Sequence, residues 1–361
     1  PFPSTGRCWI SSDRRAPTET DPVATNPDSR RLATQPSLDF PTHAGAGIRS
    51  RSEIDVSFVH RLKDLRRWPV LNSLLTWTLR RFLPPGAARS WCLEHLPRVG
   101  IVDISVPIGG DDKSIRLVSG SDWLTSRIYW NGAQAFEPEV LLPFLAMSPG
   151  SRGTLDIGAY SGWYSLLASA ANRQSKVFAF EANPVVAEAL SANLRLNCSS
   201  NIQIFECAVS DAEGMAQFHV GSEGLASSSS LLVEWKGLHR TIEVPSRTID
   251  SIMESEGNPP VDLAKIDIEG AEGNAIRGME RTIDRWAPVM IVELLHDHRD
   301  GFRPVARSLM TRGYRCYECR EDELIPIDPL GDRFLGVDGI NFLFASDRSL
   351  CGPDIEKLLR S

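Results

Sequence analysis

The sequence of 361 residues has no uninterrupted apolar run of about 18 residues, so no conventional membrane-spanning helix is expected. It also lacks an excess of positive charge. Its 46 Asp and Glu residues outnumber 39 Lys and Arg residues and give a formal net charge of -7. This balance argues against nucleic acid as a partner. The first residues contain no apolar segment of the kind found in secretory signals.

Cysteine is scarce and scattered. The seven cysteines are an odd number without regular spacing, and they do not form the framework of a disulfide-rich secreted protein. A cytoplasmic location is therefore expected. Cys316 and Cys319 form a CxxC motif, but the second ligand pair that a structural zinc site needs is missing. We interpret this motif as coincidental.

Composition divides the chain into three predicted regions. Residues 1–52 are rich in Pro, Ser, Thr, Asp and Arg and poor in aliphatic residues, which predicts a disordered tail. Residues 53–135 are predicted to form an extension of helices and a small β unit. Residues 136–350 are predicted to form the main domain. Nothing in the sequence indicates an oligomeric state.

The extension contains one helical and one β-like signal. Within residues 54–83, apolar residues recur at helical spacing among many arginines, with Pro69 as a boundary between two helices. We interpret this segment as a helical lid with a solvated basic face. The alternative is a basic amphipathic helix in peripheral contact with a membrane. Farther along, Gly109 and Gly110 separate two β-like segments and predict a hairpin.

After Phe136, strand-like and helix-like segments alternate, which indicates a parallel sheet covered by helices. We predict an α/β fold with a mostly parallel sheet of seven strands and helices on both faces. The predicted helices are 162–172 and 184–197, and the predicted strands are 154–157, 177–180, 202–208, 216–220, 241–244, 263–268, 289–294, 314–318 and 340–344.

A glycine loop of sequence DIGAYSG, residues 156–162, follows the first strand of this domain. Ligands of open α/β sheets bind outside the carboxyl ends of the strands, where glycines let the backbone approach closely. The N-terminus of the next helix favours an anionic group. The loop therefore predicts a nucleotide-like ligand, with a tight strand–helix turn as the alternative.

Glu181 ends the next strand, about 20 residues after the loop, as a ribose-binding carboxylate does. Both a nicotinamide cofactor and S-adenosylmethionine carry such a ribose. Gly158 and Gly162 do not form a GxGxxG pattern, and Asp156 precedes them. A cationic methionyl ligand tolerates Asp156, whereas a pyrophosphate does not need it. This spacing favours S-adenosylmethionine.

Four motifs in this order resemble the FkbM family of methyltransferases. They are the glycine loop, the FEANP sequence of residues 180–184, the AVSD sequence of residues 208–211 and the KIDIEGAE sequence of residues 265–272. The Ser-rich residues 227–230 and the NFLF sequence of residues 341–344 are similar to the family as well. The resemblance covers about residues 136–345 and implies a Rossmann-like class I methyltransferase fold. It also implies methylation of hydroxyl groups on sugars, polyketides and related small molecules.

The resemblance assigns roles to individual residues of the cofactor site. Asp156, Gly158 and Gly162 would contact the methionyl part, and Glu181 would hold the ribose. Asn183 would lie near the adenosine. Ser210 and Asp211 would close the third strand and contact the adenine, with an ordinary capped loop as the alternative. Tyr160 belongs to the same predicted site without an assigned role.

A second group of charged residues marks the predicted catalytic site. Lys265, Asp267 and Glu269 are spaced by two, so a strand would project them to one face, and Glu272 follows on a helix. Buried unpaired charges are costly, so these groups must face a cleft, a ligand or one another. A purely structural ion-pair cluster is the alternative.

Methyl transfer to a hydroxyl requires alignment of the oxygen and removal of its proton. Asp267, Glu269 or His296 are the candidate bases. A divalent metal bound by Glu293, His296 and His298 with Asp267 is an alternative that we do not favour.

The function predicted from the sequence is an S-adenosylmethionine-dependent methyltransferase that acts on a small-molecule or glycan acceptor. The competing classes are a nicotinamide-dependent oxidoreductase and a non-catalytic nucleotide-binding module.

Overall fold

The structure is a computed structural model that describes residues 68–84, 86–96, 98–120, 123–221, 239–321 and 323–349. The predicted tail of residues 1–52, the first part of the predicted helical segment up to residue 67, and the Ser-rich residues 227–230 lie outside these ranges. None of the helices in the described ranges combines the length and the apolar character needed to cross a bilayer.

The extension contains helices and one hairpin. Helix α2 begins at Pro69, which occupies its first turn, where a missing N–H costs nothing. Gly109 and Gly110 both have positive φ and join β1 and β2 in antiparallel register, as the predicted hairpin requires. The elements of this region are α2 (Pro69–Phe82), α3 (Ala87–His95), β1 (Val99–Ile108), β2 (Asp111–Gly120), α4 (Trp123–Asn131) and η2 (Ala133–Ala135).

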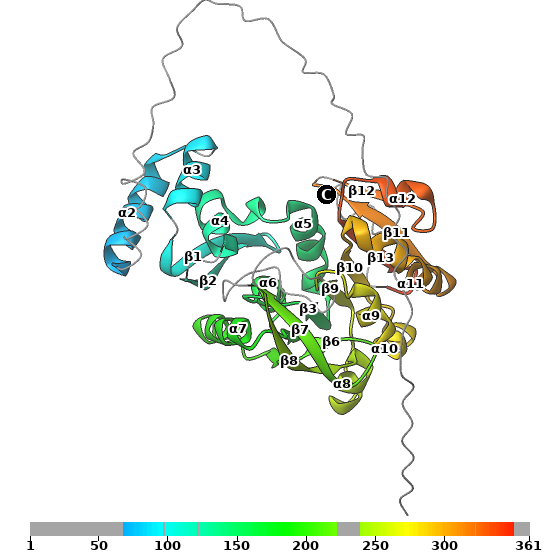
Figure 1. Cartoon of the computed structure of the whole chain (residues 1–361). Coiled ribbons are helices and arrows are strands. Elements are labelled where there is room, and N and C mark those ends of the chain that lie inside the picture. The colour runs from blue at the N-terminus through cyan, green and yellow to red at the C-terminus, as the bar shows by residue number, and fades with distance from the viewer. Residues whose placement is uncertain are drawn as a thin grey trace, which may run out of the picture. The chain divides into compact units, whose positions relative to one another are not determined.

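The central sheet has eight strands in the order β12-β11-β13-β10-β9-β3-β4-β5. Figure 1 labels its strands β12, β11, β13, β10, β9 and β3. The strands β10, β9, β3, β4 and β5 are parallel neighbours, whereas β13 runs antiparallel between β10 and β11. The prediction of a mostly parallel sheet with about seven positions is confirmed, and β12 adds one strand at the edge. The strands are β3 (Gly153–Ile157), β4 (Lys176–Phe180), β5 (Ile202–Phe205), β9 (Leu263–Ile266), β10 (Val289–Glu293), β11 (Tyr314–Cys319), β12 (Leu324–Ile327) and β13 (Asn341–Ser346).

Helices cover both faces of this sheet, and each face has its own core. One core joins the hairpin and α4, α5, α6 and α7 to the sheet, and the other joins α8, α9, α10, α11 and α12 to it. Asn183 caps α7 by accepting the Val185 N–H at 3.1 Å, with Pro184 as the first helical residue. The helical elements are α5 (Pro138–Met147), η3 (Ser148–Gly150), α6 (Trp163–Ala171), α7 (Pro184–Leu196), α8 (Ile249–Ser255), α9 (Glu272–Arg277), α10 (Glu280–Trp286), η4 (His296–His298), α11 (Arg299–Thr311) and α12 (Asp332–Gly336).

Two predicted strands are shorter than the sequence pattern indicates. The predicted strand 202–208 ends as β5 at Phe205, because the Cys207 N–H donates to the Phe205 carbonyl and turns the chain out of the sheet. The chain then enters a separate three-stranded sheet of β6 (Ala208–Val209), β8 (His239–Arg247) and β7 (Gly214–Gly221). The predicted strand 263–268 ends as β9 at Ile266.

The two cysteines of the CxxC motif lie on opposite faces of the sheet. Both belong to β11, and their odd spacing sends Cys316 into one core and Cys319 into the other. Burial raises the pKa of both thiols, Cys316 well above its ordinary range. The pair therefore packs as two small apolar side chains, without a shared ligand.

A buried arginine joins the end of β10 to the segment before β13. Arg299 begins α11, is fully buried, and donates to the carbonyls of Leu294, Val337 and Gly339 as well as Phe334. Its guanidinium also lies 5.1 Å from the centre of the Phe342 ring. This one side chain satisfies four main-chain acceptors that would otherwise be buried without a donor.

Replacing Arg299 by methionine should lower the free energy of unfolding by about 3–5 kcal/mol, because four buried carbonyls lose their donor. Urea unfolding followed by circular dichroism measures this loss. Arg307→Met, at an exposed position on the same helix, is the matched control and should cost less than about 0.5 kcal/mol. Equal losses in the two variants would show that the Arg299 hydrogen bonds are not important for stability.

Candidate active site

The candidate site lies where the carboxyl ends of β4, β3, β9 and β10 meet. The chain runs from β3 outward through β4 to β5 and returns to β9 on the other side of β3, so the order of strands reverses at β3. Ligands of open α/β sheets bind at such a reversal. The glycine loop, Glu181, Asp267 and Glu293 all follow or end these four strands.

The glycine loop is held against the turn that follows β9. Gly158 has a φ of 87°, and a Cβ there would lie 1.8 Å from the Asp267 carbonyl oxygen, so only glycine fits. Gly162 also has a φ of 87°, and a Cβ there would lie 2.4 Å from Leu190 Cδ1. At both positions the fold itself leaves no space for a side chain, so glycine is required whether or not a ligand binds.

Asp156 lies inside β3 and is buried, where its Oδ2 accepts a hydrogen bond of 2.6 Å from Ser165 Oγ. Burial raises the pKa of this carboxyl group, although Ser165 and Lys265 oppose the shift. Its predicted contact with a methionyl group stays a prediction.

Glu181 is buried and oriented by the loop that precedes it. Its two carboxylate oxygens accept the main-chain N–H groups of Tyr160, at 2.9 Å, and Asn183, at 2.8 Å. Burial raises its pKa to about 7. Each oxygen keeps capacity for a further donor, as binding of a diol requires. Tyr160 has a positive φ of 50°. Its role in the structure is that of its main chain, whose N–H group orients the Glu181 carboxylate.

Three buried polar atoms around the loop have no hydrogen-bond partner among the described residues. They are Ser161 Oγ, Trp163 Nε1 and the Asn183 side-chain nitrogen Nδ2. All three residues are at least nine-tenths buried. A buried donor without an acceptor costs about 1–3 kcal/mol, so such groups seldom persist without a partner. They fit a polar ligand held between the glycine loop and Glu181.

Ser210 and Asp211 do not lie at the position predicted from the sequence, the end of the third strand of the main sheet. They do not close the third strand of the main sheet, because that strand ends at Phe205 and they follow β6 of the small sheet. Burial tends to raise the pKa of Asp211, but Arg277, whose Nε donates a hydrogen bond of 2.9 Å to it, outweighs this effect and leaves the pKa below the ordinary value. Their predicted contact with adenine stays a prediction.

Lys265 is the centre of the charged cluster. It is only 4% exposed, and its Nζ lies 2.6 Å from Asp267 Oδ2 and 3.8 Å from Glu137 Oε2. It also lies 4.8 Å from the centre of the Tyr164 ring. Burial alone would remove its charge, but the neighbouring carboxylates outweigh this effect and raise the pKa of Lys265.

Glu137 and Tyr164 also belong to this cluster, although the sequence pattern did not predict them as site residues. Glu137 precedes α5 with a φ of 43° and accepts a hydrogen bond of 2.8 Å from the Tyr164 hydroxyl. Burial raises the pKa of both groups, and for Glu137 the attraction of Lys265 opposes the shift. The only sequence signal was an acidic residue before Pro138, at the boundary between the two predicted regions.

Asp267, Glu269 and Glu293 converge, with carboxylate oxygens all within 4.8 Å of one another. The sequence pattern grouped Lys265, Asp267 and Glu269 correctly, but the prediction that they lie on one face of a strand is wrong. The strand ends at Ile266, and Glu269 has a positive φ of 56°. A turn therefore brings the carboxylates together. The predicted metal set is also different, since no histidine is among these three residues.

The environment gives these carboxyl groups different proton affinities. Burial tends to raise the pKa of Asp267, but Lys265 outweighs it and lowers the pKa below the ordinary value. Burial and the charge of Asp267 raise the pKa of Glu293 to about 11 and that of Glu269 to about 7. Asp267 therefore favours its ionised form and Glu293 its protonated form, and Glu269 is about half ionised near neutral pH.

Glu272 fixes the turn that carries these groups. Its Oε1 accepts the main-chain N–H groups of Gly270, at 2.9 Å, and Ile268, at 3.2 Å. His298 packs against the same turn, because a Cβ on Gly270 would lie 2.9 Å from its ring. His296 lies in η4 with an exposed side chain. Of the two histidines, His298 contacts the turn, and the role of His296 as a base stays a prediction.

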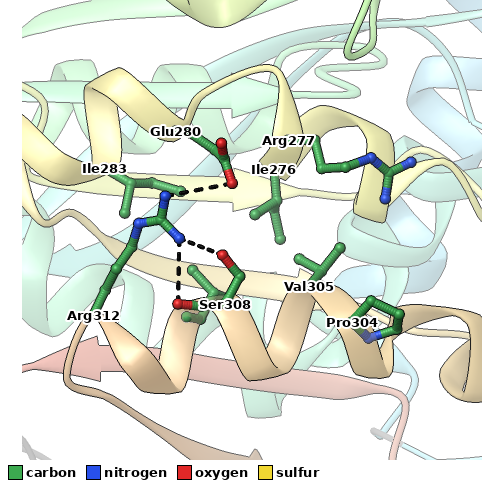
Figure 2. A pocket seen from close by; sticks show the side chains of 9 residues that line it. Ile276, Arg277, Glu280, Ile283, Pro304, Val305, Ser308 and Arg312 are labelled. Atoms are coloured by element: carbon green, nitrogen blue, oxygen red, sulfur yellow. Dashed lines mark hydrogen bonds and ion pairs between the residues drawn. The ribbon is translucent and has the colours of Figure 1, made fainter.

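A separate pocket of about 210 Å³ lies between α9, α10 and α11 (Figure 2). Its floor is apolar, with Ile276, Ile283 and Val305, and it contains none of the predicted site residues. Arg312 reaches across it to Glu280 at 3.4 Å and to Ser308 (Figure 2). Because Arg312 is already paired there, we do not assign the chemistry to this pocket.

Comparison with known proteins finds similarity to methyltransferases over the part of the chain that contains the site. Residues 156–316 match the family model described as the methyltransferase FkbM domain. Methyltransferase sdnD of Sordaria araneosa is 26% identical over 195 residues, which cover 46% of this chain and 74% of that protein. The 2-O-methyltransferase NoeI of Sinorhizobium fredii (strain NBRC 101917 / NGR234) is 26% identical over 144 residues, 36% of this chain and 58% of that protein.

A solved structure of methyltransferase FkbM from Methylobacillus flagellatus KT shares 19% sequence identity with this chain at a TM-score of 0.36. The similarity covers 54% of this chain and 43% of that one, so this chain spans less than half of its length. The family match falls inside the part of the chain whose motifs resemble FkbM proteins, and the sheet has the predicted class I methyltransferase architecture. Residues 156–316, which contain the glycine loop and the charged cluster, therefore resemble the FkbM domain of methyltransferases.

Proposed function

We propose that this protein transfers a methyl group from S-adenosylmethionine to a hydroxyl group of a sugar, glycan, polyketide or related small molecule. The observation that supports the cofactor best is Glu181, a buried carboxylate whose oxygens are oriented by two main-chain N–H groups. The unpartnered buried atoms of Ser161, Trp163 and Asn183 support a polar ligand at the same place. Hydroxyl specificity is supported by NoeI, a relative whose name describes 2-O-methylation.

Glu181 would hold the two ribose hydroxyls, and Asn183 would donate to the adenosine with its free Nδ2. The residues of the glycine loop, Asp156, Gly158, Tyr160 and Gly162, would line the methionyl part, and Ser210 and Asp211 would lie toward the adenine. S-adenosylmethionine supplies a reactive methyl group on a sulfonium ion. The protein must therefore align the acceptor oxygen and remove its proton.

Glu269 is the best candidate for the base among Asp267, Glu269 and His296. A base is most effective when its pKa lies near the working pH, and burial raises the pKa of Glu269 to about 7. Asp267 is less suited, because Lys265 holds it ionised as a weak base. In this proposal, Asp267 and Lys265 orient the acceptor hydroxyl, and Glu269 takes its proton. No step requires a metal ion.

Isothermal titration calorimetry of the full chain should detect binding of S-adenosylhomocysteine with a dissociation constant in the micromolar range. This corresponds to a binding free energy of about -8 kcal/mol. The thermal unfolding midpoint should rise in the same solution, because the ligand binds the folded state. NAD is the control ligand and should produce neither effect. Heat and stabilisation with NAD alone would instead identify a nicotinamide-dependent protein.

The affinity for S-adenosylhomocysteine should fall about tenfold between pH 8 and pH 6, because Glu181 must be ionised to accept two hydroxyl donors. With a pKa of about 7 in the free protein, the carboxyl group is mostly protonated at pH 6. Glu181→Gln should weaken binding about tenfold or more at pH 8 and remove this pH dependence. An unchanged pH dependence in the variant would remove Glu181 from the ribose site.

Methyl transfer should depend on Glu269 and not on His296. A panel of monosaccharides, glycans and polyketides incubated with methyl-labelled S-adenosylmethionine identifies an acceptor. With that acceptor, Glu269→Gln should lower kcat about a hundredfold and leave S-adenosylhomocysteine affinity within about threefold. His296→Gln is the matched control and should keep the wild-type rate. The opposite pattern would assign the base to His296.

A further inference from the structure

Helix α2 exposes a largely apolar face, although Leu75 and Leu79 on its inner side pack against the core. Its two fully buried side chains are polar, Asn72 and Thr76. The outward positions hold large apolar residues instead, including Val70 at 85% exposed, Leu74 and Trp77 at 61% each, and Phe82 at 77%. Residues 54–67 of the predicted lid lie outside the described residues, and in α2 the exposed face is mostly apolar, with Arg81 on it, rather than basic.

Polar contacts set this orientation of α2. Asn72 Oδ1 accepts the main-chain N–H of Val99 at the start of β1, at 3.0 Å. Ser73 Oγ accepts a hydrogen bond of 2.5 Å from the guanidinium of Arg98, which is buried. Rotation of the helix to bury its apolar face would break both contacts and leave buried polar groups unpaired.

The outward face of α2, here called the α2 face, is continuous. At 100° per residue, Val70, Leu71, Leu74, Trp77, Thr78, Arg81 and Phe82 fall on one side of the helix. Thr78 directs its hydroxyl to the Leu74 carbonyl at 2.8 Å, so its methyl group remains for the surface. The face contains no acidic residue, and Arg81 is its only charge.

More apolar surface adjoins this helix in the sequence and in the fold. Trp68, just before α2, is 67% exposed, and the cross-strand neighbours Ile101 and Val118 of the hairpin are exposed as well. The described residues have twelve exposed large apolar side chains, and nine of them fall within residues 68–123. An exposed apolar surface of this kind marks an interaction site.

The charge of this part of the chain indicates which partner it fits. Residues 56–93 contain seven Arg and Lys residues and one acidic residue, Asp64, in a chain with a net charge of -7. A second copy of the α2 face offers no acidic partner for Arg81, which disfavours a symmetric dimer. Tryptophan prefers the boundary between headgroups and hydrocarbon, and each arginine near an anionic lipid surface contributes about 1 kcal/mol.

We propose that the α2 face binds the surface of a membrane rich in anionic lipid, with α2 lying in the plane of the headgroups. Trp77, Leu74 and Val70 enter the boundary of the hydrocarbon layer, and Arg81 pairs with lipid phosphate. This is binding to one leaflet, which needs no membrane-spanning helix.

Sedimentation with vesicles tests this proposal. The full-length protein should sediment with vesicles of phosphatidylcholine mixed with phosphatidylserine, and only weakly with phosphatidylcholine alone. Leu74→Glu combined with Trp77→Glu should reduce binding about tenfold or more, because it places charge in the apolar layer. Arg81→Gln should reduce it about fivefold by removing one cation. Met310→Glu, at an exposed apolar position on α11, is the matched control and should bind like wild type.

Each variant is checked for folding by circular dichroism and by S-adenosylhomocysteine binding. Three results would overturn the proposal: no sedimentation of the wild-type protein with the anionic vesicles, equal sedimentation with neutral vesicles, or full binding by the double variant. Light scattering on the same protein samples tests whether a second copy of the chain, rather than a membrane, covers the α2 face. A wild-type dimer that the double variant converts to a monomer would assign the α2 face to a contact between copies and also overturn the proposal.

Discussion

The candidate site depends on one constraint, a lysine whose charge is buried at the end of a central strand. An isolated ammonium group at the position of Lys265 would be too costly, so the fold must supply negative partners. It does so from separate elements, with Asp267 after β9 and Glu137 before α5. Burial and the charge of Asp267 then raise the pKa of Glu293 and of Glu269. The chemistry of the cluster therefore follows from the need to neutralise Lys265.

The main features of the fold could be predicted because they rest on local patterns. Alternation of strand-like and helix-like segments predicted the sheet and its covering helices, and paired glycines predicted the hairpin. Strand ends were harder to predict, because they depend on single main-chain hydrogen bonds. The Cys207 N–H that ends β5 is one example. No sequence period contains that information, and this is why Ser210 and Asp211 were placed on the wrong strand.

The site was only partly accessible to sequence reasoning for a related reason. Lys265, Asp267 and Glu269 lie close together in the sequence and could be grouped, although a turn, rather than a strand, brings them together. Glu137 lies far from them along the chain and joins them only through tertiary packing of α5. Helix α2 illustrates the opposite limit. Its apolar spacing predicted a helix correctly, but the direction of the apolar face depends on Asn72, a polar residue.

Gly158 has a mechanical consequence for the site. The Asp267 carbonyl oxygen occupies the space where a side chain of residue 158 would lie, so the main chains of the glycine loop and of the turn after β9 are in direct contact. The Asp267 N–H also donates to the Ile157 carbonyl at 2.9 Å. Main-chain contacts of this kind leave no rotamer that could absorb a displacement. We therefore expect a shift of the glycine loop to displace the main chain of Asp267 as well.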